Sequence, residues 1–133
     1  MITAVDTSIL IDLLEGDPDF GERSAAAIAQ AAGQGALIAC EVVWAEVATA
    51  YAPDEDVVED LRTLGIRFDA MSEASALRAA AVWAEHRNAG GSRRRIAADF
   101  LIGAHAMLQA DRLLTRDAGF HRQHFTPLEV MTP

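Results

Sequence analysis

The chain alternates between short apolar runs and longer stretches in which apolar residues recur every three or four positions. A short apolar run between turn residues is typical of a buried strand, and the longer recurrence is typical of a helix. The pattern predicts strands at residues 2–5, 36–40, 66–68, 112–115 and 128–131. It predicts helices at residues 8–14, 17–32, 41–51, 55–64, 72–87 and 95–110. This alternation predicts an α/β fold, with a parallel sheet of about five strands and helices on both faces.

Four acidic residues fall at positions that this arrangement brings to one edge of the sheet. Asp6 directly follows the first predicted strand, and Asp117 stands just beyond the fourth. Glu46 lies near the start of the helix after the second strand, and Asp99 near the start of the helix before the fourth. Right-handed crossovers place helix starts near the carboxyl edge of a parallel sheet, where ligands bind. If the strand order reverses between the first and fourth strands, Asp6 and Asp117 flank that binding point.

Two of these acids stand where a plain surface acid is unexpected. Glu46 shares its helix face with Val43, and Asp99 shares its face with the small residues Gly103 and Ala106. Ionised carboxylates are rarely buried without a partner. The chain has no lysine to supply one, because all 11 of its basic residues are arginine.

A divalent metal ion would resolve this crowding of negative charge. Two carboxylates ~5 Å apart repel by roughly 3 kcal/mol at an effective dielectric near 20. Oxygen ligands without a nearby cysteine or histidine pair suit Mg²⁺, or Mn²⁺ in its place, rather than Zn²⁺. Such an ion meets substrate phosphate and activates water. The positions and charges therefore predict a Mg²⁺-dependent phosphodiesterase.

A plainer interpretation stays open at this point. Asp6 or Thr7 could serve only as the N-cap of the helix that follows. The four acids would then be caps and surface residues that meet by chance.

Composition narrows the classes of protein further. A length of 133 residues fits one domain, residues 1–133. The net charge of −9 disfavours a non-specific nucleic-acid coat protein, and the lack of lysine excludes a phosphate-binding GxxxxGK[ST] loop and a lysine Schiff base. We expect no membrane span and no signal peptide. The lone Cys40 favours a reduced, cytoplasmic protein.

Four motifs in one order carry a resemblance that covers nearly the whole chain. They are Val5-Asp6-Thr7-Ser8, Trp44-Ala45-Glu46-Val47, the stretch 98–106 (Ala-Asp-Phe-Leu-Ile-Gly-Ala-His-Ala) and the stretch 113–120 (Leu-Leu-Thr-Arg-Asp-Ala-Gly-Phe). Each motif alone is weak, but the ordered set is specific. The sequence resembles PIN-domain proteins, and among these the VapC toxins of bacterial type II toxin–antitoxin pairs.

The resemblance implies a three-layer PIN-like fold over residues 1–133, with strand order 3-2-1-4-5. It implies Mg²⁺-dependent endoribonuclease activity on RNA, a homodimer and a small cognate antitoxin as partner. It also implies an acidic metal site with two supporting hydroxyl residues, namely Asp6, Glu46, Asp99 and Asp117 with Ser8 and Thr115.

Arginines near these acids are candidate RNA-binding residues. Arg93, Arg94 and Arg95 open the helix that carries Asp99, as either a solvated helix end or a clamp for RNA phosphates. Arg116, between Thr115 and Asp117, is the better single candidate, because its position places it at the sheet edge. The glycine- and arginine-rich stretch 90–95 matches no part of the family pattern.

Other polar residues receive structural interpretations. His121 and His124 are expected to be surface residues rather than a zinc pair, and Asp12 is expected to face solvent.

Two competing functions of the protein remain. A phosphatase of the haloacid dehalogenase type is disfavoured because Ser8 replaces the second acid of its Asp-x-Asp pair. A non-catalytic acidic module could instead grip an arginine of a partner.

Overall fold

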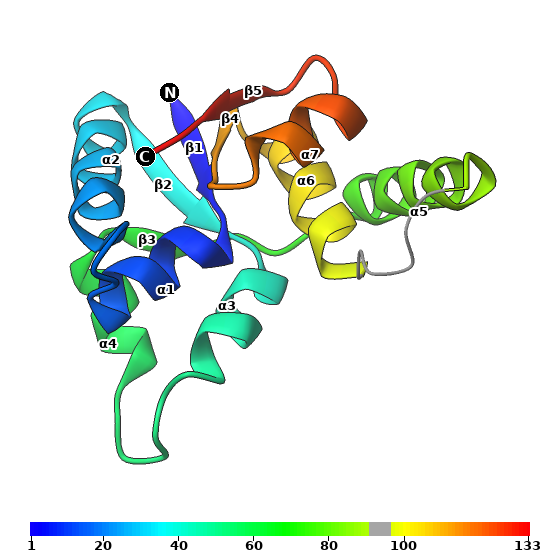
Figure 1. Ribbon diagram of the computed structural model, residues 1–133. Helices are drawn as coiled ribbons and strands as arrows, with labels where there is room; N and C mark the ends of the chain where they lie inside the picture. The colour runs from blue at the N-terminus through cyan, green and yellow to red at the C-terminus, as the bar shows by residue number, and fades with distance from the viewer. Residues whose placement is uncertain (91–96) are drawn as a thin grey trace.

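The computed structural model describes residues 1–90 and 97–133. Its centre is a sheet of five parallel strands in the order β3-β2-β1-β4-β5 (Figure 1). The strands are β1 (Ile2–Val5), β2 (Ala36–Ala39), β3 (Ile66–Phe68), β4 (Arg112–Leu114) and β5 (Glu129–Met131). The α/β class and the strand order 3-2-1-4-5 are thus confirmed.

Helices cover both faces of this sheet. They are α1 (Thr7–Glu15), α2 (Gly21–Gln34), α3 (Glu41–Ala48), α4 (Val57–Thr63), α5 (Glu73–Asn88), α6 (Ala97–Gln109) and α7 (Ala118–His124). In Figure 1, α1 and α2 lie on one side of β1 and β2, and α6 lies on the other with α5 outside it. Among the described residues, every helix falls short of the length and hydrophobicity that crossing a bilayer requires.

The main core lies where the strands meet the inner helices. Val5, Ile38 and Leu113 from the sheet belong to one buried cluster with Ile9 and Leu10 of α1. Strands covered on both faces need apolar residues at nearly every position, which is why the sequence shows them as continuous apolar runs. Strand positions were therefore the part of the fold that the hydrophobic pattern predicted best.

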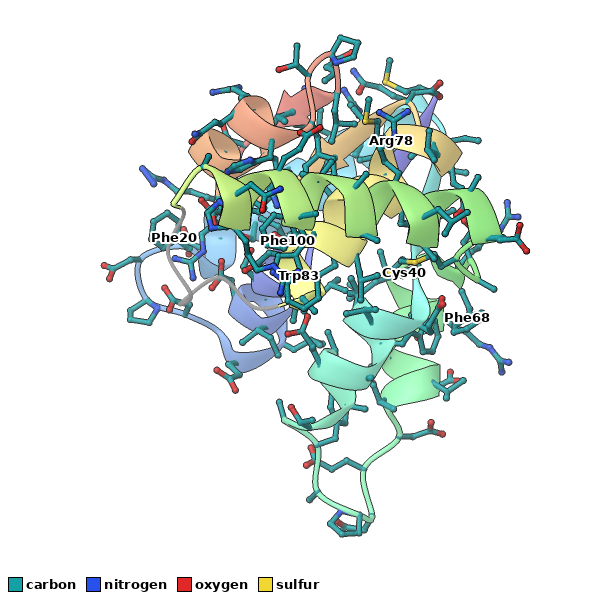
Figure 2. The ribbon with its side chains drawn as sticks, turned by 90° about the vertical axis from the view of Figure 1, so that its right-hand side faces the viewer. Phe20, Cys40, Phe68, Arg78, Trp83 and Phe100 are labelled. Atoms are coloured by element: carbon teal, nitrogen blue, oxygen red, sulfur yellow. The ribbon has the colours of Figure 1, made fainter. Side chains whose placement is uncertain are left out.

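A second, aromatic cluster joins α5, α6 and α7. The fully buried ring of Phe100 stacks on Trp83 of α5, with 6.0 Å between ring centroids, and Figure 2 shows both alongside α5. Phe125 closes the other end of the cluster, and a Cβ atom at Gly103 of α6 would overlap its ring. Gly103 is thus required for close packing.

Two parts of the predicted helix pattern are wrong. Helix α7 was missed, because its seven residues make about two turns, too few to show a clear periodicity. Helix α2 begins at Gly21 rather than at Asp17. Gly16 ends α1 in the left-handed conformation (φ 63°), and the Oδ1 atom of Asp17 then accepts hydrogen bonds from the backbone N–H groups of Asp19 (2.9 Å) and Phe20 (2.8 Å). Asp17 caps a turn and not a helix.

Candidate active site

The four predicted acids line one pocket at the carboxyl edge of the sheet. The pocket has a volume of about 340 Å³, and it is open to solvent. Its walls come from the start of α1, from α3, from the first turns of α6 and from the segment after β4. The lining residues are Asp6, Thr7, Ser8, Glu46, Asp99, Ile102, Arg116 and Asp117.

Asp6 stands where the strand order reverses. Its backbone N–H donates to the carbonyl of Leu114 on β4 (2.9 Å), while β2 pairs with the other side of β1. Its Oδ1 accepts from the backbone N–H of Thr7 (2.7 Å), so Asp6 is indeed the N-cap of α1. Capping and lining the pocket are compatible, because the helix start itself faces the pocket.

Burial raises the pKa of the Asp6 carboxyl from its ordinary 3.8 to about 6. Hydrogen bonds from Thr115 and Thr7 lower this pKa, and the negative charges of Asp99 and Glu46 raise it. Only 9% of Asp6 is exposed. The carboxylates are therefore close enough to repel one another, and the pocket favours a bound positive charge.

Thr115 connects the two acids that flank the reversal of strand order. This fully buried residue donates from Oγ1 to Oδ2 of Asp6 (2.6 Å). The same oxygen accepts from the backbone N–H of Asp117 (3.0 Å), the residue at the N-cap of α7. One hydroxyl thus fixes the Asp6 carboxylate relative to the chain that carries Asp117.

A second hydroxyl orients Glu46, through a contact that no sequence motif indicates. Oγ1 of Thr7 donates to Oε1 of Glu46 (2.8 Å). Ser8, the predicted supporting residue, also lines the pocket, but within the described residues its buried Oγ has no hydrogen-bond partner. A bridge between positions 7 and 46 follows only from the pairing of β1 with β2, so no local motif could reveal it.

The pocket suits a hard divalent cation that keeps part of its water shell. The oxygen atoms that would coordinate the cation belong to four carboxylates, and the Ser8 hydroxyl remains available to a water or an ion. Among residues 1–90 and 97–133, no three acidic, histidine or cysteine side chains stand ready to hold a bare ion. Mg²⁺ usually binds through one or two carboxylates plus waters, so a pocket lined by four acids offers it enough ligands.

Arg116 reaches the pocket, but it is not a free surface cation. Its Nε atom lies 2.9 Å from Oδ2 of Asp12, and its guanidinium carbon lies 4.3 Å from the centroid of the Phe20 ring. Asp12 is only 3% exposed, so the expectation that it faces solvent is wrong. It is buried because α2 folds back over α1, where the Ser24 hydroxyl donates to it (3.3 Å). The predicted Arg93, Arg94 and Arg95 lie outside the described residues.

His121 is also buried, contrary to the expectation of a surface residue. It is 1% exposed, and its Nε2 lies 3.9 Å from Oδ2 of Asp6. Its ring lies between Phe120 and Phe125, at 5.0 and 6.0 Å between centroids. The hydrophobic pattern did not predict α7, so it could not predict that this imidazole lies next to the acidic pocket.

Fold and site together define a class of protein: an α/β domain of order 3-2-1-4-5 with an open acidic pocket at the reversal of strand order. The sequence profile of the PIN domain matches residues 3–125. The chain belongs to the PIN domain family.

Solved structures with the same fold include toxin–antitoxin complexes. VapBC-1 from nontypeable Haemophilus influenzae is 20% identical, with a TM-score of 0.72 over 99% of this chain and 98% of that one. VapBC2 from Rickettsia felis, bound to a promoter DNA fragment, is 17% identical, with a TM-score of 0.71 over 99% and 98%. A toxin–antitoxin complex from Klebsiella pneumoniae is 25% identical, with a TM-score of 0.66 over 98% and 97%. A search of curated proteins gave no significant match.

Proposed function

We propose that the chain is a divalent-metal-dependent endoribonuclease that acts as the toxin of a toxin–antitoxin pair. The observation that carries the proposal is the single pocket ringed by Asp6, Glu46, Asp99 and Asp117, in which burial and neighbouring charge raise the pKa of Asp6. Membership of the PIN domain family supports a nuclease. Residues 1–133 form one such domain, and the RNA substrate and lone cysteine suit the cytoplasm.

The four carboxylates would hold Mg²⁺, or Mn²⁺ in its place. When bound, the ion would supply an activated water and stabilise the charge that develops on the phosphate. Thr115 holds the Asp6 carboxylate in place, and Thr7 holds that of Glu46, so neither side chain has to reorder when the ion enters. Ser8 and Arg116 line the same pocket, where the Ser8 hydroxyl would donate to a water and Arg116 would bind a substrate phosphate at the rim.

The proposed partners follow from the solved structures of similar fold. These include complexes of a toxin with its antitoxin from three bacteria. By analogy, we propose a cognate antitoxin that covers the pocket and a homodimer of this chain. Co-expression with a candidate antitoxin, followed by co-purification, tests the first, and light scattering tests the second.

RNA cleavage by the purified protein tests the activity. With Mg²⁺ it should cut RNA, and chelator should stop the cutting. Asp6→Asn and Asp99→Asn should each abolish cutting while circular dichroism shows an unchanged fold. Asp54→Asn is the matched control, because Asp54 is an exposed acid outside the pocket, and it should cut like the parent. Cutting that persists in both pocket variants, or in chelator, would end the proposal.

Metal titration separates the competing functions. A module that only grips an arginine of a partner would gain no thermal stability from Mg²⁺, whereas a metal enzyme would. A phosphatase would hydrolyse a phosphate monoester such as p-nitrophenyl phosphate, and we expect no such hydrolysis here.

A further inference from the structure

Arg116 is held at the rim of the acidic pocket by residues that lie outside it. Among the described residues that line the pocket, Arg116 is the basic one. An arginine next to four carboxylates is attracted inward, where it would neutralise the acids instead of binding substrate. In the structure, Arg116 instead pairs with Asp12 of α1 and lies over Phe20.

The Asp12 carboxylate is built into the protein interior. Its side chain is 4% exposed, and it also accepts a hydrogen bond from Ser24 of α2. A buried carboxylate strongly favours its partner cation, because separation would leave a charge in a poorly solvated place. The ion pair engages Nε of Arg116. A guanidinium carries further N–H donors on its two terminal amino groups, and these are the groups that can bind a phosphate.

Phe20 supports the same guanidinium from one face. It lies on the segment between α1 and α2, at the left of Figure 2. The turn that carries it is fixed by Asp17, whose Oδ1 accepts from the Phe20 backbone N–H (2.8 Å). Arg23 lies over the same ring at 5.4 Å, but it does not line the pocket. The ring is thus a platform for two arginines, only one of which faces the site.

We propose that Asp12 and Phe20 are positioning residues that hold Arg116 as a fixed clamp for a phosphate of the substrate. They act on affinity through Arg116 and do not touch the substrate themselves. The inference rests on the proposed nuclease function. It explains how a chain with a net charge of −9 attracts RNA to this edge: one cation is kept away from the acids and faces outward.

The test is steady-state cleavage of a single-stranded RNA oligonucleotide in Mg²⁺, over a range of salt concentrations. Asp12→Asn, Phe20→Leu and Arg116→Gln should each raise KM about tenfold, with kcat within about twofold. Losing one phosphate contact should also reduce the slope of log kcat/KM against log salt by roughly 0.7. Arg23→Gln is the matched control, and it should leave both unchanged.

A double-mutant cycle identifies the route of the effect. In an Arg116→Gln background, Asp12→Asn should cause no further rise in KM, because the residue through which it acts is already gone. A purely structural Asp12 would instead lower the thermal midpoint and leave KM and the salt slope of the folded protein unchanged. That result, or additive effects of the two substitutions, overturns the inference.

Failure of the clamp is distinguishable from failure of the function. If the parent protein cuts RNA and Asp12→Asn and Phe20→Leu match it in KM and salt slope, only the clamp is wrong. If the parent neither cuts RNA nor binds it by fluorescence anisotropy, both proposals are wrong.

Discussion

The acidic pocket should reduce the stability of the metal-free protein, and Asp6→Asn measures the cost. Asp6 is buried beside two other acids, and its pKa in the folded chain is about 6 against an ordinary value of 3.8. Because the folded state raises this pKa, protonation of Asp6 favours folding. The contribution of Asp6 is therefore most favourable below about pH 3.8, and it is lost as the pH rises through about 6.

The size of the effect follows from the difference between the two pKa values. At 1.36 kcal/mol for each unit, that difference corresponds to about 3 kcal/mol of folding free energy lost between pH 4 and pH 7. Asparagine removes the charge, but it has one oxygen where two are used, for the Thr7 N–H and the Thr115 hydroxyl. With roughly 1 kcal/mol deducted for the weaker hydrogen bond, we expect Asp6→Asn to stabilise the protein by about 2 kcal/mol at pH 7.5.

Urea unfolding of both proteins in chelator, at half-unit steps from pH 4 to pH 8, measures this. The difference between them, variant minus parent, should grow as the pH rises through about 6 and then level off. Asp17→Asn is a control of opposite sign. Hydrogen bonds from the backbone of Phe20 and Asp19 lower the pKa of Asp17, so its stabilising contribution is present at neutral pH and is lost as the pH falls. The reasoning is refuted if the Asp6→Asn variant is less stable than the parent at pH 7.5. It is also refuted if the difference in unfolding free energy does not change between pH 4 and pH 8.

Three further outcomes follow from the same contacts. Mg²⁺ at millimolar concentration should raise the thermal midpoint of the parent protein and have a much smaller effect on Asp99→Asn, as differential scanning fluorimetry can show. Thr115→Val removes the donor to Asp6, so denaturant unfolding at pH 7.5 should show a loss of about 1–3 kcal/mol, and the pKa of Asp6 should rise further. Gly103→Ala forces a methyl group against the Phe125 ring, so unfolding should show a loss of about 1–3 kcal/mol; an unchanged midpoint would mean that the ring moves aside freely.

The sheet and the four acids were predictable because each depends on short stretches of sequence. Ala36–Ala39 is apolar at every position, and Arg112–Leu114 ends in two buried leucines, so both strands could be recognised from their own residues. Parallel pairing then brings the strand ends to one edge, whatever the loops do. Asp6 and Asp117 reached the same pocket for that reason.

The contacts that orient these acids could not be predicted in the same way. Thr7 reaches Glu46 across β1 and β2, and His121 reaches Asp6 from a helix of seven residues with little pattern of its own. Asp12 is buried only because α2 returns over α1, which depends on where α1 ends at Gly16. Such side-chain pairs depend on tertiary packing, which cannot be predicted from the local patterns of a single sequence.

The unfavourable charge of the pocket and its proposed function have the same physical origin. A site that binds a doubly charged ion needs several carboxylates in one pocket in the absence of that ion. Burial in this pocket, and to a smaller extent the charges of Asp99 and Glu46, raise the pKa of Asp6. Thr115 and Thr7 prevent the acids from relaxing apart, since each hydroxyl ties a carboxylate to a neighbouring strand or helix. The metal-free fold therefore carries this electrostatic cost, and the proposed bound cation would remove it. Substitutions that stabilise the metal-free chain at this edge should accordingly be those that weaken metal binding.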